Sequence, residues 1–148
     1  MKKQKIYLAG PFFNERETTL IREFAARLRE EYEVFVPMEH TAEGDVPFGS
    51  FAWGEEIFYI DVRGLRDADF VVALDHGFTS DAGTAWEMGY AHALGKPSYI
   101  VSVAEGDPTR SLMLLFGCTR YFASFDDLWD HLHGKEVPSA EDRGIKAK

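Results

Sequence analysis

The strongest constraint on the fold is an unbroken apolar run, FVVAL at residues 70–74, which lies between polar segments. A strand that is apolar at every position is typical of a sheet covered on both faces, because neither side of it meets water. Four other short apolar segments also have strand character, and segments of helical spacing separate them. The predicted strands are 5–10, 33–37, 70–74, 98–103 and 120–125.

The intervening segments predict helices. Apolar residues recur at helical spacing over 15–32, and Ser50 can cap a second helix that runs up to the RDAD sequence. A third helix, TAWEMGYAHALG, ends at a glycine that is followed closely by a proline. Two shorter helices are predicted at 111–117 and 126–132.

This alternation predicts an α/β fold with a five-stranded parallel sheet and helices on both faces. The expected strand order is 2-1-3-4-5, the flavodoxin-like (Rossmann-like) arrangement, in which ligands bind at the carboxyl ends of strands one and three. Two loops are thereby singled out, one within YLAGPFFNERE (7–17) and the other DHGFTSDAG (75–83). We expect one domain over residues 1–134 and a loose tail over 135–148, because the tail lacks apolar periodicity.

Composition narrows the class of partner. The net charge of −9 repels polyanions, so nucleic acid is not an expected partner and a small-molecule substrate is. No apolar stretch is long enough to cross a bilayer, and the N-terminal run is too short for a signal peptide. A single cysteine fits a reducing compartment, so we expect a cytoplasmic protein without membrane association.

The second loop and the helix after it carry two acids, Asp81 and Glu87. Small residues surround Glu87 and leave space above its carboxylate. A glutamate near a helix N-terminus is expected to stay ionised, which suits a nucleophile. The alternative is that Glu87 only complements the helix dipole and that Asp81 only forms the turn.

Two further residues are candidates by position. Tyr7 lies near the end of the first strand, where its hydroxyl is expected to approach Glu87 and fix the carboxylate. Asp61 interrupts the apolar side of the second helix, so it is either a solvent-facing residue or a third acid in the same pocket. Acids that share a pocket push their pKa values apart, which would separate a proton donor from a nucleophile.

Metal and nucleotide-cofactor chemistry find little support in the sequence. His131 and His133 point away from each other on a helix, and the other histidines share no ligand spacing with them. The chain contains neither a P-loop nor a GxGxxG sequence. We therefore expect no metal site and no cofactor.

The combination of KIYLAGPFFNERE, the DV pair at 61–62, SDAGTAWEMGYAHALGKP and the later SLML resembles the nucleoside 2-deoxyribosyltransferase family. The likeness runs in order from residue 5 to about residue 122. It implies the flavodoxin-like fold and a transfer of 2-deoxyribose between nucleobases through a covalent intermediate, with retention of configuration. It also implies a homo-oligomer in which neighbouring subunits complete each site.

The resemblance implies a role for each matching residue. Glu87 would be the nucleophile, Tyr7 would orient it, and Asp61 would act with Asp81 on the base and its proton. The residues expected to bind substrate are Asp81, Phe13, Gly10, Ser111 and Gly83. The rings of the first loop would divide their roles, with Phe13 facing the base and Phe12 packing.

One position departs from the transferase pattern. Ser111 stands where these transferases usually have an asparagine that reaches a neighbouring subunit's sugar. The related deoxynucleoside 5-monophosphate N-glycosidases use serine and basic groups there to hold a phosphate, and TRS at 109–111 is chemically suited to that. The sequence thus predicts a deoxyribosyltransferase, with a monophosphate N-glycosidase as the alternative and a non-catalytic nucleoside-binding module as a third possibility. The segments 48–60 and 111–117 are the expected subunit interface, or else core.

Overall fold

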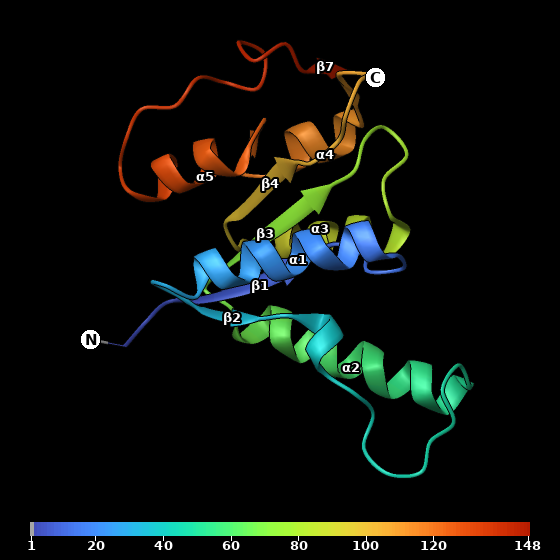
Figure 1. Cartoon of the computed structure of the whole chain (residues 1–148). Helices are drawn as coiled ribbons and strands as arrows, with labels where there is room; N and C mark the ends of the chain where they lie inside the picture. The colour runs from blue at the N-terminus through green and yellow to red at the C-terminus, as the bar shows by residue number, and fades with distance from the viewer. Residues whose placement is uncertain (1) are drawn as a thin grey trace.

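The computed structural model describes residues 2–148. A five-stranded parallel sheet forms its centre, in the order β2-β1-β3-β4-β6 (Figure 1). Its strands are β1 (Lys5–Ala9), β2 (Glu33–Phe35), β3 (Phe70–Asp75), β4 (Ser98–Ser102) and β6 (Arg120–Phe122). Since β6 is the fifth strand of the sheet, the predicted order 2-1-3-4-5 and the α/β class are confirmed.

Helices cover both faces of this sheet. They are α1 (Glu15–Leu28), α2 (Phe51–Asp67), α3 (Ala82–Ala93), α4 (Leu112–Gly117) and α5 (Phe125–Leu132), with a 3-10 turn η1 at Pro37–Glu39. The buried side chains of α1 and α5 form one apolar core with one face of the sheet, and those of α2, α3 and α4 form a second core with the other face. Figure 1 shows that the first half of α2 and the loop before it extend away from the sheet.

Alternate side chains of β1 belong to the two different cores. Ile6 and Leu8 belong to the core under α1, whereas Tyr7 and Ala9 belong to the core under α2 and α3. All four side chains are fully buried. Successive side chains of a strand point to opposite faces, so the register that buries Leu8 also directs Tyr7 towards α3.

The first helix is shorter than predicted. It ends at Leu28 rather than at Tyr32. The amide of Tyr32 still donates to the Leu28 carbonyl, but the chain has already turned towards β2, and the Tyr32 ring packs edge-on against Phe70. The apolar periodicity continued because Tyr32 contacts the same core as the helix, not because it lies in the helix.

The segment 135–148, predicted to be a loose tail, folds back onto the domain. Its β7 (Lys146–Ala147) pairs in parallel with β5 (Thr109–Arg110) in a separate two-stranded sheet. Arg143 donates to both carboxylate oxygens of Asp127 at 2.9 and 2.8 Å, and Ile145 packs against the second core. Isolated contacts of this kind leave no apolar period in the sequence, which is why the pattern did not predict them.

Candidate active site at the carboxyl ends of β1 and β3

The strand order places β1 beside β3, so the loops that follow these strands meet at one edge of the sheet. Tyr7 of β1 is fully buried there, and its ring stacks on Phe35 with the centroids 5.3 Å apart. Its hydroxyl donates a hydrogen bond to a carboxylate oxygen of Glu87 on α3. The structure thus brings together two residues that are 80 positions apart in the sequence.

Tyr7 is held as a hydrogen-bond donor. Its pKa is raised, first by burial and then by the nearby negative charges of Glu87 and Asp61. A phenol in this environment keeps its proton throughout the physiological range, so it can only donate to the carboxylate beside it. The geometry therefore fixes the orientation of the Glu87 carboxylate.

Glu87 differs from the expectation of a fully ionised carboxylate. Burial raises its pKa to about 7, although the Tyr7 hydrogen bond acts in the opposite direction. The charges of Asp61 and Asp81 contribute further to the rise. Glu87 is the sixth residue of α3, and the stabilising effect of a helix N-terminus fades within the first turn, so desolvation outweighs it.

Asp61 of α2 lies close enough to Tyr7 and Glu87 for its charge to raise the pKa of both. Its pKa is raised to about 6 by burial. Within residues 2–148, its buried Oδ1 atom has no hydrogen-bond partner. A carboxyl group that has a pKa near neutrality and an oxygen without a partner is suited to exchanging a proton with a ligand. Proton transfer is most efficient when the pKa lies near the working pH.

Asp81 caps α3. Its Oδ2 atom accepts hydrogen bonds from the amide and the hydroxyl of Thr84, both at 2.8 Å. A side chain at Gly83 would place its Cβ 3.3 Å from that oxygen, so a glycine there leaves the cap uncrowded. The structural role considered from the sequence is therefore present, and the Asp81 charge also lies close enough to Glu87 to raise its pKa.

The loop after β1 contributes backbone and aromatic surface. A Cβ at Gly10 would come within 2.9 Å of Ile21 Cδ1 and 3.4 Å of Leu74 Cβ, so the observed contacts of Gly10 are with α1 and β3. The rings of Phe12 and Phe13 lie nearly parallel with centroids 6.2 Å apart. Phe13 is 82% exposed and Phe12 is 44% exposed, so both rings remain available at the surface instead of filling the core.

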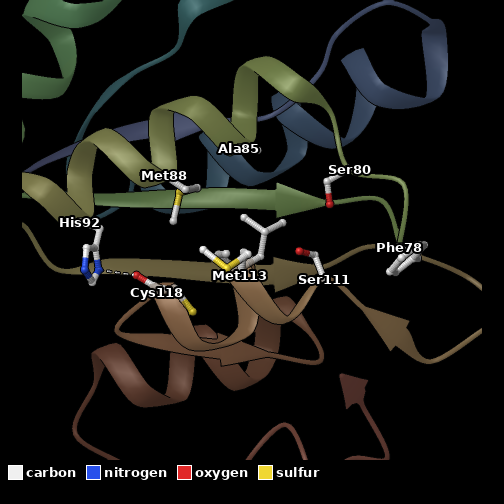
Figure 2. A pocket seen from close by; sticks show the side chains of 12 residues that line it. Phe78, Ser80, Ala85, Met88, His92, Ser111, Met113 and Cys118 are labelled. Carbon is white, nitrogen blue, oxygen red and sulfur yellow. Dashed lines mark hydrogen bonds between the residues drawn. The ribbon is translucent and has the colours of Figure 1, made fainter. Parts of the chain in front are cut away.

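Ser111 lies apart from these residues. Together with Met88 and His92 it lines a cavity of about 350 Å³ between α3 and α4 (Figure 2). Met88 and His92 lie on one side of α3. Successive side chains on a helix are rotated by about 100°, so Glu87 lies on a different side of α3 from these two residues. Within one chain the structure therefore does not bring Ser111 to the Tyr7–Glu87 pair.

The sequence reasoning missed a buried polar group beside the site. Asp75, the last residue of β3, is 3% exposed and accepts a hydrogen bond from the hydroxyl of Tyr121 at 2.7 Å. The available signal was an acid at the end of an entirely apolar strand, a position that usually ends up buried with its neighbours. The tyrosine that partners it is 46 residues away, and no local pattern indicates it.

Replacing Tyr7 with phenylalanine tests the electrostatic coupling directly. Loss of the donated hydrogen bond removes the one contribution that lowers the Glu87 pKa, so that pKa should rise from about 7 by roughly one pH unit. An NMR titration of the Glu87 side-chain carboxyl measures this value. Tyr32→Phe removes a hydroxyl from the other face of the sheet and should leave the titration unchanged. An equal Glu87 pKa in both variants would contradict the coupling.

Comparisons with known proteins agree with this geometry. Residues 6–127 match the family profile described as nucleoside 2-deoxyribosyltransferase. The structure resembles that of the 2-deoxyribosyltransferase of the psychrotolerant bacterium Bacillus psychrosaccharolyticus, with a TM-score of 0.77 and 33% sequence identity. That match covers 90% of this chain and 98% of the other.

Three other relatives are more distant or less informative. The uncharacterized protein UU063 of Ureaplasma parvum is 30% identical, over 88% of this chain and 95% of its own length. A conserved protein of Enterococcus faecalis has a TM-score of 0.58 and 30% identity over 67% of this chain and 63% of its own. The CMP N-glycosidase BcmB of Clostridium botulinum has a TM-score of 0.57 over 88% of this chain and 97% of its own, and its 16% identity supports the shared fold alone.

Within residues 2–148, no helix has both the length and the apolar character needed to span a membrane. The profile match covers most of the chain, and its range includes Tyr7, Asp61, Asp81 and Glu87. On these grounds the chain belongs to the nucleoside 2-deoxyribosyltransferase family.

Proposed function

We propose that this protein exchanges nucleobases on 2-deoxyribonucleosides, with Glu87 as the nucleophile. The observation that carries the proposal is the partly buried hydrogen bond from Tyr7 to Glu87, with Asp61 and Asp81 close enough to influence the Glu87 carboxyl. One nucleophile, one group that orients it and two further acids are the minimum set for displacing a base from a sugar and recapturing another.

In the first half of the proposed reaction, the Glu87 carboxylate attacks the anomeric carbon of the sugar. The bond from that carbon to the base nitrogen breaks, and its electron pair stays with the base. A proton from Asp61 or Asp81 neutralises the leaving base. The raised pKa of Asp61, about 6, makes it the better reservoir for this proton.

In the second half, a nitrogen of the incoming base attacks the same carbon and displaces Glu87 as a free carboxylate. The proton lost by that nitrogen returns to the acid. Two displacements at one carbon restore the original configuration, as in retaining glycosidases. Tyr7 donates a hydrogen bond to the Glu87 carboxylate. This hydrogen bond orients Glu87 when it attacks the sugar and stabilises its charge when it leaves.

The alternative, hydrolysis of deoxynucleoside 5-monophosphates, needs a phosphate cradle around residues 109–111. The contacts of this region favour the transferase. Arg110 is 3% exposed and donates to the carbonyls of Asp107 and Thr109 at 2.6 and 2.7 Å. The amide of Leu112 donates to the Lys148 carbonyl. The two terminal nitrogens of Arg110 and the amide of Leu112 therefore already have partners, and the Nε atom of Arg110, which has none, is buried.

We further propose a homo-oligomer in which Ser111 of one subunit serves the site of its neighbour. This would explain why Ser111 lies on the other side of α3 from Glu87. Large apolar side chains support such an interface in both predicted segments. Met113 and Phe116 of α4 are mostly exposed, as are Phe48 in the loop before α2 and Phe51 at its start.

The direct test is incubation with deoxyinosine and adenine in phosphate-free buffer, followed by chromatography. Deoxyadenosine and hypoxanthine should appear in equal amounts. Excluding phosphate prevents the same products from arising through a contaminating phosphorylase. Free base and deoxyribose, with a 5-monophosphate consumed much faster than the nucleoside, would instead support the hydrolase. Ligand binding with no turnover of any of these substrates would support a binding module.

A further inference from the structure

A second set of polar residues is buried beside the candidate site, at the carboxyl ends of β3 and β4 and on β6. Asp75 and Arg110 are each 3% exposed, and Ser102 is 9% exposed. Within residues 2–148, neither charged side chain has a direct ion-pair partner. Buried charges without a salt bridge are rare, so their remaining contacts call for an explanation.

A hydroxyl group lies next to each of the two charges. The Arg110 guanidinium donates to the Ser102 hydroxyl at 2.9 Å, and the Tyr121 hydroxyl donates to Asp75 Oδ2 at 2.7 Å. Arg110 and Ser102 both act to lower the pKa of Tyr121, so they lie near its hydroxyl. The pKa of Tyr121 is nevertheless raised, first by burial and then by Asp75, so its hydroxyl remains a donor.

The other oxygen of Asp75 holds the loop that leads into α3. Asp75 Oδ1 accepts a hydrogen bond from the Ser80 hydroxyl at 3.0 Å and a longer one from the amide of Gly77 at 3.4 Å. Ser80 directly precedes Asp81, which caps α3 through Thr84. Hydrogen bonds thus run from Tyr121 through Asp75 to Ser80, the residue beside Asp81.

We propose that Asp75 is a positioning residue, held by Tyr121, that fixes the 76–81 loop through Ser80 and so sets the place of the Asp81 carboxylate. The loop has one large apolar side chain, Phe78, and this is 46% exposed, so packing alone does not anchor the loop. A buried carboxylate, itself fixed from behind by a phenol, supplies a rigid acceptor at the base of the loop. The assignment of Asp81 to base binding rests on the proposed function, whereas the ordering of the loop does not.

Two variants separate the parts of this network. Ser80→Ala removes the contact to the loop and leaves the buried charges intact. Tyr121→Phe removes the support behind Asp75 and preserves the ring. Tyr99→Phe is the matched control, because Tyr99 lies on the adjacent strand β4 and packs against the opposite core.

Amide hydrogen exchange of residues 76–84, followed by mass spectrometry, tests the loop without reference to activity. Exchange should become roughly tenfold faster in Ser80→Ala and in Tyr121→Phe, since each loses a hydrogen bond in the path to a charged group. Exchange in Tyr99→Phe should match the wild type. Because both variants act through Asp75, the double variant should exchange little faster than the single variants. Unchanged exchange in Ser80→Ala would overturn the proposal even if Tyr121→Phe failed to fold.

Kinetics provide the second readout. If the loop positions Asp81 against the base, both variants should raise the KM for the acceptor base about tenfold and change kcat less. Simple destabilisation would lower the apparent kcat through loss of folded protein and leave KM unchanged. A wild-type protein that exchanges no bases would refute the proposed function while leaving the hydrogen-exchange result to decide the loop. Faster exchange with an unaltered KM would confine Asp75 to a structural role and overturn its part in base binding.

Discussion

Replacing Glu87 with glutamine is expected to lower the kcat for base exchange by at least about 1,000-fold. The amide keeps nearly the same shape and can still accept the hydrogen bond from Tyr7, so the fold and the orientation of the side chain should survive. It has no negative charge to attack the anomeric carbon, so the covalent intermediate cannot form. Initial rates of deoxyadenosine formation measure the loss.

A matched control separates chemistry from surface charge. Glu23→Gln makes the same replacement on the exposed face of α1 and should keep the wild-type rate. Intact-protein mass spectrometry of wild type quenched during turnover should reveal one added deoxyribosyl group, mapped by proteolysis to the peptide that contains Glu87. Wild-type rates in Glu87→Gln, or an adduct mapped to another acid, would remove Glu87 from the role of nucleophile.

The second large effect concerns stability and pH. The Glu87 pKa lies at about 7 in the folded protein, above its ordinary value of 4.5. A carboxyl whose pKa is raised by folding stabilises the fold below its unfolded pKa, and that stability is lost as the pH rises through the folded pKa. The contribution of Glu87 to the free energy of unfolding should therefore fall by about 3 kcal/mol between pH 4.5 and pH 8. The raised pKa of Asp61 adds to the loss in the same direction.

The Glu87→Gln variant exposes this contribution, because it replaces the titrating group with a neutral one. Its free energy of unfolding should exceed that of the wild type by about 2–3 kcal/mol at pH 8 and match it near pH 4.5. Urea denaturation of both proteins at the two pH values gives the difference. A difference that stays constant between the two pH values would mean that the Glu87 pKa is not raised.

These two expectations have a common cause. The proposed nucleophile is buried where its charged form is poorly solvated, and this raises its pKa while it makes the unliganded protein less stable at neutral pH. Residues that serve a reaction often oppose stability in this way. Glu87→Gln should therefore yield a protein that is more stable and inactive, a combination that loss of packing cannot produce.

The strand order was predictable because the sequence of β3 alone indicates a central strand. Every residue of FVVAL is buried, and an apolar run of this kind has few alternatives to a central parallel strand. Once β1 and β3 were adjacent, the meeting of Tyr7 and Glu87 followed from the alternation of side chains in one strand and the start of one helix. A resemblance to a known family supplied the chemical roles, which periodicity does not contain.

The sequence could not predict features that depend on long-range polar contacts. The bidentate pair of Arg143 with Asp127 orders a segment that looks unstructured by composition. The pKa of Glu87 depends on its burial and on residues distant in the sequence, Tyr7 and Asp61, whereas its position near a helix start suggested the opposite direction. The partnership of Asp75 with Tyr121 joins two strands that are not adjacent in the sheet.

The sheet also separates the proposed reacting groups from the core under α1 and α5. The proposed nucleophile, its tyrosine and Asp61 belong to the side of α2 and α3, whereas α1 and α5 pack on the opposite face. Substitutions in the core under α1 and α5 can therefore accumulate, by drift or by design for heat tolerance, without replacing any of the reacting groups. A protein built in this way has one half that can adapt to temperature and another that can adapt to substrate.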